Sequence, residues 1–174
     1  VAKSAQGSTL DGLNTHFACI DELHAHKTRE VYDVVETSIG KRLQPLLFAI
    51  TTAGFNLSGI CYELRNYVIE VLSGKSSGGD DQFGIIYTID KEDDWTSDSA
   101  LIKANPNWGV SVHPETIKSL RDKAQTVASA VNNFKTKHLD VWCNADAAWM
   151  DLIKWNECGD PALEESDFYG QESW

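Results

Sequence analysis

The chain has 174 residues, of which 42% are hydrophobic and 24% are charged, values typical of one globular domain or of one domain with part of a second. These values exclude a largely disordered chain, a collagen and a coiled coil. No apolar run approaches the roughly 20 residues that a membrane-spanning helix needs. The formal net charge of -11 argues against a free-standing nucleic-acid-binding domain, because such a domain should carry a basic surface.

Charge and tryptophan are distributed unevenly along the chain. Residues 140–174 contain nine acidic side chains, beginning with Asp140, and a single basic one, Lys154. All six tryptophans lie beyond residue 90. This asymmetry predicts a first region over residues 1–92 and a Trp-rich, acidic second region over residues 93–174. We expect the acids from Asp140 onward to form a solvated linker.

The four cysteines form no CxxC pair. Cys19 and Cys61 stand in apolar patterns, which favours buried free thiols over a disulfide or metal framework. Free thiols in turn indicate a reducing compartment.

Two short apolar runs predict neighbouring strands in the first region. Residues 16–20 (HFACI) are followed by two acids, and residues 46–50 (LLFAI) are followed by two threonines. Short apolar runs of this kind are typical of buried parallel strands. Residues 29–40, between the runs, predict a helix that ends at Gly40.

The same alternation continues to residue 89. From residue 58, apolar positions recur at helical spacing as far as Leu72, and Gly74 predicts the end of that helix. Residues 83–89 (FGIIYTI) predict a third strand after a loop rich in glycine and serine. Strand, helix, strand, helix, strand is the order of an α/β fold with a parallel sheet.

The second region shows only helical patterns. Ser97 can cap a short helix that ends before Pro106, and Pro114 opens the next helix. Four residues of that helix should share an apolar face: Ile117, Leu120, Ala124 and Val127. Later helical segments carry Val131, Phe134, Leu139 and Trp142, and then Trp149, Leu152 and Ile153. We expect the tryptophans to form a small helical core.

Polar side chains follow both of the first two predicted strands. Asp21 and Glu22 follow the first, and the second is followed by Thr51, Thr52, Ala53 and Gly54. Ligands of open α/β sheets bind beyond the carboxyl ends of the strands, so both tips should face one crevice. Nucleotide hydrolysis needs an acid that holds Mg²⁺ through its waters, which suits Asp21, and a group that orients or deprotonates the attacking water, which suits Glu22. The threonine hydroxyls can sense whether the γ-phosphate is present and transmit this state through the strand.

The ordered set of motifs resembles the large terminase subunit of tailed bacteriophages, the ATP-driven motor that packages viral DNA. The resemblance begins with LDGLN at 10–14, HFACIDELHAH at 16–26 and LLFAITTAG at 46–54. Further along, YTID at 87–90, ANPNWG at 104–109 and FKTKHLDVW at 134–142 resemble that family's link between ATPase and nuclease. The resemblance covers nearly the whole chain.

The resemblance implies roles, cofactors and partners. Asp21 and Glu22 match the Walker B acids, with Glu22 as the catalytic carboxylate, and residues 51–54 match the coupling motif that joins hydrolysis to DNA movement. The full-length protein is then expected to use ATP and Mg²⁺. Its expected partners are viral double-stranded DNA, the portal and the small terminase subunit, in the cytoplasm of the host cell and without a membrane.

Two features of the resembled family have no counterpart in the sequence. The Walker A phosphate loop should precede residue 1, and the RNase H-like nuclease should follow residue 174. The chain is therefore expected to be an internal fragment, with the C-terminal half of the ATPase core in residues 1–92 and a linker toward the nuclease in residues 93–174. Its sheet should be the partial parallel sheet of a P-loop-type ATPase that lacks its Walker A strand.

Such a fragment should bind no nucleotide and turn over no ATP on its own. In the resembled family the Walker A strand lies between the coupling strand and the last strand. Without it, the strands over residues 46–50 and 83–89 would each expose an apolar edge. Exposed edges of this kind predict self-association, a shifted strand or partial disorder.

Other interpretations stay open. A DExH-type helicase or translocase fragment would use DELH at 21–24 as its acid motif, and a non-catalytic acidic interaction module would show no nucleotide dependence. His24 and His26 could be metal ligands, although histidines that pack beside a nucleotide crevice or face solvent are the simpler interpretation. The GKS at 74–76 does not fit a phosphate loop. It follows a helix rather than a strand, and Ile69 stands where the phosphate-loop pattern needs glycine.

Overall fold

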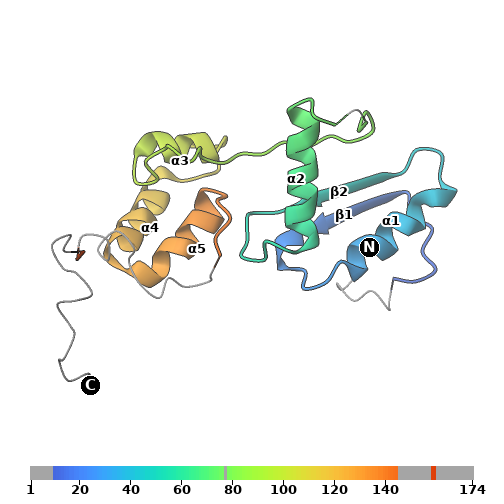
Figure 1. The fold of residues 1–174 in the computed structure, drawn as a ribbon, viewed down its shortest axis with the longest axis horizontal. Helices are drawn as coiled ribbons and strands as arrows, with labels where there is room; N and C mark the ends of the chain where they lie inside the picture. Colours follow the sequence, from blue (N-terminus) through green and yellow to red (C-terminus); the bar gives the residue numbers. More distant parts are fainter. Residues whose placement is uncertain (1–9, 77, 145–157, 160–174) are drawn as a thin grey trace, which may run out of the picture.

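The computed structural model describes residues 10–76, 78–144 and 158–159, and its elements form two groups along the chain (Figure 1). The first group contains β1 (Phe17–Asp21), α1 (Glu30–Ser38), β2 (Leu46–Ile50) and α2 (Ile60–Leu72). The second contains α3 (Asp98–Ala104), α4 (Pro114–Thr126) and α5 (Ala128–His138). The 3-10 turns Leu23–Ala25 and Ile39–Lys41 follow β1 and α1.

Strands β1 and β2 pair in parallel, in a register that runs from Phe17 opposite Leu46 to Asp21 opposite Ile50. Parallel neighbours need a crossover connection, and α1 provides it. The two predicted strands, the crossover helix and α2 are therefore confirmed, as is the α/β class with a small parallel sheet.

Helices α1 and α2 cover one face of this sheet. Ile20 of β1 is 6% exposed and lies in one cluster with Val35 of α1 and with Ile60 and Cys61 of α2. Each fully buried side chain of this size stabilises the fold by about 1.5–3 kcal/mol. The predicted burial of the Cys61 thiol is confirmed.

The other face of the sheet is apolar and exposed. Phe17 is 58% exposed, and Leu46, Phe48 and Ile50 are between 43% and 54% exposed. Cys19 lies on this face because it pairs with Phe48, and it is exposed, so the prediction of a buried thiol is wrong at this position. We call Phe17, Cys19, Leu46, Phe48 and Ile50 the open sheet face.

The third predicted strand does not form. Residues 83–89 make no strand ladder in the structure, although the chain there keeps a two-residue alternation, with Phe83, Ile85 and Tyr87 exposed. A strand needs a neighbour for its N–H and C=O groups, and β1 and β2 make up the sheet of the described residues without it. Residues 83–89 therefore have the apolar pattern of a strand, but no neighbouring strand among the described residues pairs with them.

The second group has its own core. Leu101, Phe134 and Leu139 are at most 3% exposed, and α4 and α5 pack beside each other around them. The Ser97 side chain accepts a hydrogen bond from Ala100 N, which confirms the predicted cap of α3. The buried stripe of α4 is narrower than expected, because Ile117 and Ala124 are buried while Leu120 and Val127 are 38% and 41% exposed.

The tryptophans do not share one core. Trp95 and Trp108 pack against the second group, but Trp142 packs against the first, with its ring 5.0 Å from that of Tyr62. The predicted segment around Trp149, Leu152 and Ile153 lies outside the described residues. Among the described residues, no helix is long and apolar enough to cross a membrane.

Candidate functional site

The predicted acids and threonines lie at one edge of the sheet. Asp21 is the last residue of β1 and pairs with Ile50, the last residue of β2. Glu22 therefore follows one strand where Thr51 follows its neighbour. The structure places these residues at one edge of the sheet, as the strand pattern predicts.

The backbone turns sharply at Glu22. This residue adopts the left-handed conformation, with φ 51° and ψ 47°, and it begins the 3-10 turn Leu23–Ala25. A non-glycine residue in this region costs about 1–2 kcal/mol. The buried Leu23 side chain, 2% exposed, holds the turn against the core. Residues that the fold holds in strained backbone conformations cluster at functional sites. The left-handed conformation of Glu22 therefore makes it a candidate functional residue.

His24 connects Glu22 to the end of β2. Its backbone N–H donates to Thr51 Oγ1 at 3.0 Å. Its ring Nδ1 lies 2.9 Å from Thr51 Oγ1 and 3.0 Å from Glu22 Oε2. Burial, and then the charge of Lys137, lower the pKa of His24, so the imidazole is neutral near pH 7. Its Nδ1 is hydrogen-bonded to Thr51, and the Glu22 carboxylate lies in close electrostatic contact with the same nitrogen.

Lys137 reaches this edge from α5. Its Nζ lies 2.7 Å from His24 Nε2 and donates to Thr52 Oγ1 at 3.2 Å. The second group of helices thus makes a direct polar contact with both predicted motifs.

Asp140 makes a second contact between the groups. Its Oδ1 accepts a hydrogen bond from Ala53 N at 3.1 Å, and Cys143 N donates to Gly54 O at 3.3 Å. Burial raises the pKa of Asp140 to about 6, although the Ala53 N–H and the Lys137 charge act in the opposite direction. The prediction that the acids from Asp140 onward are solvated is therefore wrong for Asp140 itself, which is half-buried.

Gly54 allows these parts to approach closely. A Cβ atom added there would lie 3.0 Å from His24 Cβ. The last position of the TTAG motif therefore has little room for a side chain.

The environment of Asp21 is compatible with a hydrated cation. Its side chain is exposed and makes no hydrogen bond or ion pair with the described part of the chain. Mg²⁺ keeps several waters and needs only one or two carboxylates, so this environment fits it. Among the described residues, no group of three or more His, Cys, Asp or Glu side chains could hold a metal, which argues against the interpretation of His24 and His26 as metal ligands.

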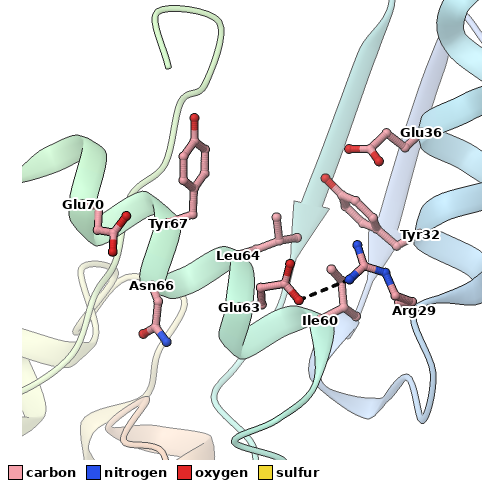
Figure 2. Close-up of a pocket in the computed structure, with 9 residues that line it drawn as sticks. All are labelled: Arg29, Tyr32, Glu36, Ile60, Glu63, Leu64, Asn66, Tyr67 and Glu70. Carbon is pink, nitrogen blue, oxygen red and sulfur yellow. Dashed lines mark hydrogen bonds and ion pairs between the residues drawn. The ribbon is translucent and has the colours of Figure 1, made fainter. Parts of the chain in front are cut away.

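Two open pockets flank this region. One of about 370 Å³ lies beside the acids and is lined by Asp21, Glu22, residues 25–28, Glu30 and Val31. A larger one, of about 450 Å³, lies between α1 and α2 (Figure 2). There Arg29 Nη1 donates to Glu63 Oε2 at 3.3 Å, and burial raises the pKa of Tyr32 to about 12. The larger pocket contains neither strand tip, whereas the smaller one contains the end of β1.

Three residues of this network were not predicted to act there. His24 stands inside the DELH run but has a simpler interpretation as a packing residue. Lys137 and Asp140 lie within the run 134–142 that carries part of the resemblance, yet nothing in that run indicates contact with residues 24–53.

Comparisons with known proteins agree with the resemblance. The sequence model of the terminase large subunit, ATPase domain, matches residues 1–70, and that of the terminase large subunit, endonuclease domain, matches residues 77–174. The chain belongs to the terminase large subunit family. The two matches meet earlier than the boundary after residue 92, which stays a prediction. The expectation that the nuclease begins only after residue 174 does not agree with the endonuclease-domain match, which already covers residues 77–174.

Two relatives extend this result. The chain is 48% identical to Protein YmfN of Escherichia coli (strain K12) over 161 residues, which cover 92% of this chain and 35% of that protein. It superposes on the crystal structure of the HK97 bacteriophage large terminase with a TM-score of 0.65 and 20% identity, over 91% of this chain and 31% of that one. The fold is thus that of a large terminase, and the chain spans about a third of either relative's length.

Proposed function

We propose that the carboxyl edge of β1 and β2 is where the full-length terminase hydrolyses ATP and couples hydrolysis to DNA packaging. The parallel register carries this proposal, because it places the Asp21–Glu22 pair beside the Thr51–Gly54 motif. The family supports it, since an ATPase-domain model matches the segment that holds both motifs.

Each side chain has a defined task in this proposal. Asp21 holds Mg²⁺ through water, and the ion supplies positive charge for the phosphate oxygens of ATP. Glu22 accepts a proton from the attacking water through a carboxylate oxygen, which is general base catalysis. The Thr51 and Thr52 hydroxyls, at the end of the neighbouring strand, report the state of the phosphate to β2. None of these residues binds the ATP phosphates, which is the role of a phosphate loop. We therefore expect this chain alone to hydrolyse no ATP.

Domains, partners and location follow as further proposals. Residues 1–92 act as the C-terminal half of the ATPase core, and residues 93–174, which lie within the endonuclease-domain match, act as the linker that leads into the nuclease. The full-length motor works on viral double-stranded DNA with the portal and the small terminase subunit, in the host cytoplasm. The open sheet face and the exposed apolar residues of 83–89 give the chain surfaces for self-association.

Glu22→Gln in the full-length protein tests the proposal, because glutamine keeps the shape of the side chain but cannot accept the proton. A positioned base contributes about 10²–10⁴-fold, so steady-state ATP hydrolysis and DNA packaging should fall at least 100-fold while ATP still binds. Glu115→Gln, which removes an exposed carboxylate from α4, is the matched control and should leave both unchanged. Unchanged hydrolysis in Glu22→Gln would instead favour the non-catalytic acidic interaction module.

The family membership favours the packaging motor over the DExH-type helicase. The second group of elements agrees, because the described part of residues 93–144 forms helices rather than a second α/β motor domain.

A further inference from the structure

Lys137 and Glu22 are joined by a single side chain, His24. His24 Nε2 lies 2.7 Å from Lys137 Nζ, and His24 Nδ1 lies 3.0 Å from Glu22 Oε2. We propose that Lys137 is a positioning residue for the hydrolysis reaction, which sets the tautomer of His24 so that His24 holds the Glu22 carboxylate in place. This inference rests on the proposed role of Glu22 as the catalytic carboxylate.

The tautomer follows from the donors and acceptors available. A lysine ammonium has three donors and no acceptor, so His24 Nε2 must accept the hydrogen bond from Lys137. A neutral imidazole carries one N–H, which is then at Nδ1. That N–H is hydrogen-bonded to Thr51 Oγ1 at 2.9 Å, and Glu22 Oε2 lies 3.0 Å from the same nitrogen, close enough to be attracted by its positive hydrogen. Thr51 Oγ1 can accept the hydrogen bond from Nδ1–H, because its own hydrogen is donated to Thr52 O at 2.8 Å.

The ring of His24 is held, whereas the carboxylate of Glu22 is not. The His24 side chain is 12% exposed, and its Cβ lies against Gly54. The Glu22 side chain is 54% exposed, and its one hydrogen bond or ion pair within the described chain is the one to His24. Without the Nδ1–H, a lone pair would face the carboxylate, and Glu22 would turn toward solvent.

The position of Lys137 gives this contact a second consequence. Lys137 lies in α5, within the segment that matches the endonuclease-domain model, and it is 113 residues from His24 in sequence. Any movement of α5 away from the sheet edge would break the hydrogen bond to His24 Nε2. The geometry thus lets the second group of helices control the order of the catalytic carboxylate.

Lys137→Met in the full-length protein tests this role, because methionine keeps much of the aliphatic length and removes the donors. We expect kcat for ATP hydrolysis to fall about tenfold, a loss typical of a displaced catalytic group, with KM for ATP within twofold of wild type. Lys137→Arg, which keeps a cationic donor, should restore most of the rate. Lys123→Met, on the exposed side of α4, is the matched control and should leave kcat unchanged.

Two further measurements separate positioning from a purely structural contact. In protein with ¹⁵N-labelled histidine, the ring nitrogen shifts of His24 should show the Nδ1–H tautomer in wild type and lose it in Lys137→Met. In a His24→Gln background, Lys137→Met should cause no further loss of kcat, because the residue through which Lys137 acts is gone.

The outcomes distinguish this inference from the proposed function. If Glu22→Gln abolishes hydrolysis but Lys137→Met retains the wild-type kcat, the positioning role is wrong and the function stands. If the tautomer is unchanged in Lys137→Met, or if the losses from Lys137→Met and His24→Gln multiply, Lys137 does not act through His24. If Glu22→Gln hydrolyses ATP normally, both proposals fail.

Discussion

Asp140 is half-buried beside Ala53, and its raised pKa makes the stability of the chain depend on pH. The folded state holds the Asp140 proton up to about pH 6, whereas the unfolded state releases it near the ordinary value of 3.8. The folded state therefore binds more protons between these values, and its stability falls as the pH rises through this window. Below it, the carboxyl is neutral in both states and the penalty is absent.

Asp140→Asn should remove this penalty, because asparagine is uncharged and its carbonyl oxygen can still accept from Ala53 N–H. Each unit of pKa shift corresponds to about 1.4 kcal/mol, and solvent near the half-buried group reduces the effect, so we expect a gain of about 1–2 kcal/mol at pH 7–8. The gain should vanish near pH 4. Urea unfolding at several pH values measures it.

Asp81→Asn, in an exposed loop, is the control for the change in net charge and should show no such pH-dependent gain. An Asp140→Asn protein that is no more stable than wild type at pH 8 would show that Asp140 is not destabilised by its burial.

The sequence identifies the candidate residues that adjoin the strands, but not the residues that support them. Asp21, Glu22, Thr51 and Thr52 can be found because parallel strands that neighbour each other end at one edge. Lys137 cannot be found in this way, since 113 residues separate it from His24 and no local pattern encodes that distance. For the same reason the sequence alone does not distinguish Asp140, 87 residues from Ala53, from the other acids of the predicted linker.

At the scale of elements, residues 83–89 show what a strand pattern needs besides its sequence. The run FGIIYTI keeps the alternation of a strand, but it packs along α2 through Gly84 instead of joining the sheet. Local alternation can be predicted, whereas the hydrogen-bonding neighbour depends on the rest of the fold. The strands 17–21 and 46–50 were predictable because each is the other's partner.

Gly84→Ala tests the packing of this segment on α2. A Cβ atom at position 84 would collide with the side chain of Val68, so we expect the free energy of unfolding to fall by about 1–3 kcal/mol. Val68→Ala should relieve the clash, so that the double variant loses at least about 0.5 kcal/mol less than the sum of the two single losses. Chemical unfolding of the four proteins measures this.

Gly40→Ala provides the matched control, because nothing lies within 4 Å of a Cβ atom added there. Its effect should lie between about zero and a gain of 1 kcal/mol. Equal losses from Gly84→Ala and Gly40→Ala would contradict the close approach of residue 84 to α2.

At the scale of the whole molecule, the two groups of elements lie beside each other (Figure 1). Each has its own core, and polar contacts at one sheet edge join them. The bonds from Lys137 to His24 and from Ala53 to Asp140 span the groups, and Thr88 Oγ1 donates to Leu139 O and Asp140 O at 3.2 and 3.1 Å. The packing of Trp142 against Tyr62 adds an apolar contact. The sequence predicts both groups from composition, but not the contacts that join them.

The open sheet face should make the chain self-associate. Phe48, 44% exposed, lies near its middle, and Phe48→Glu should weaken association about tenfold or more, because burial of a phenylalanine contributes about 1.5–3 kcal/mol. Leu43→Glu, on an exposed residue outside the strands, should change little. Sedimentation velocity over a range of concentrations measures this, and a wild-type chain that stays monomeric throughout would contradict it.

The proposed role of Glu22 in the chemical step at the edge of β1 and β2 can be tested directly. The most direct measurement is the single-turnover rate of ATP hydrolysis by the full-length protein with Glu22→Gln, under conditions where ATP is bound before the reaction starts. We predict bound ATP and a rate at least about 100-fold below that of wild type and of Glu115→Gln. A wild-type rate in Glu22→Gln would contradict the assignment of this edge as the hydrolysis site.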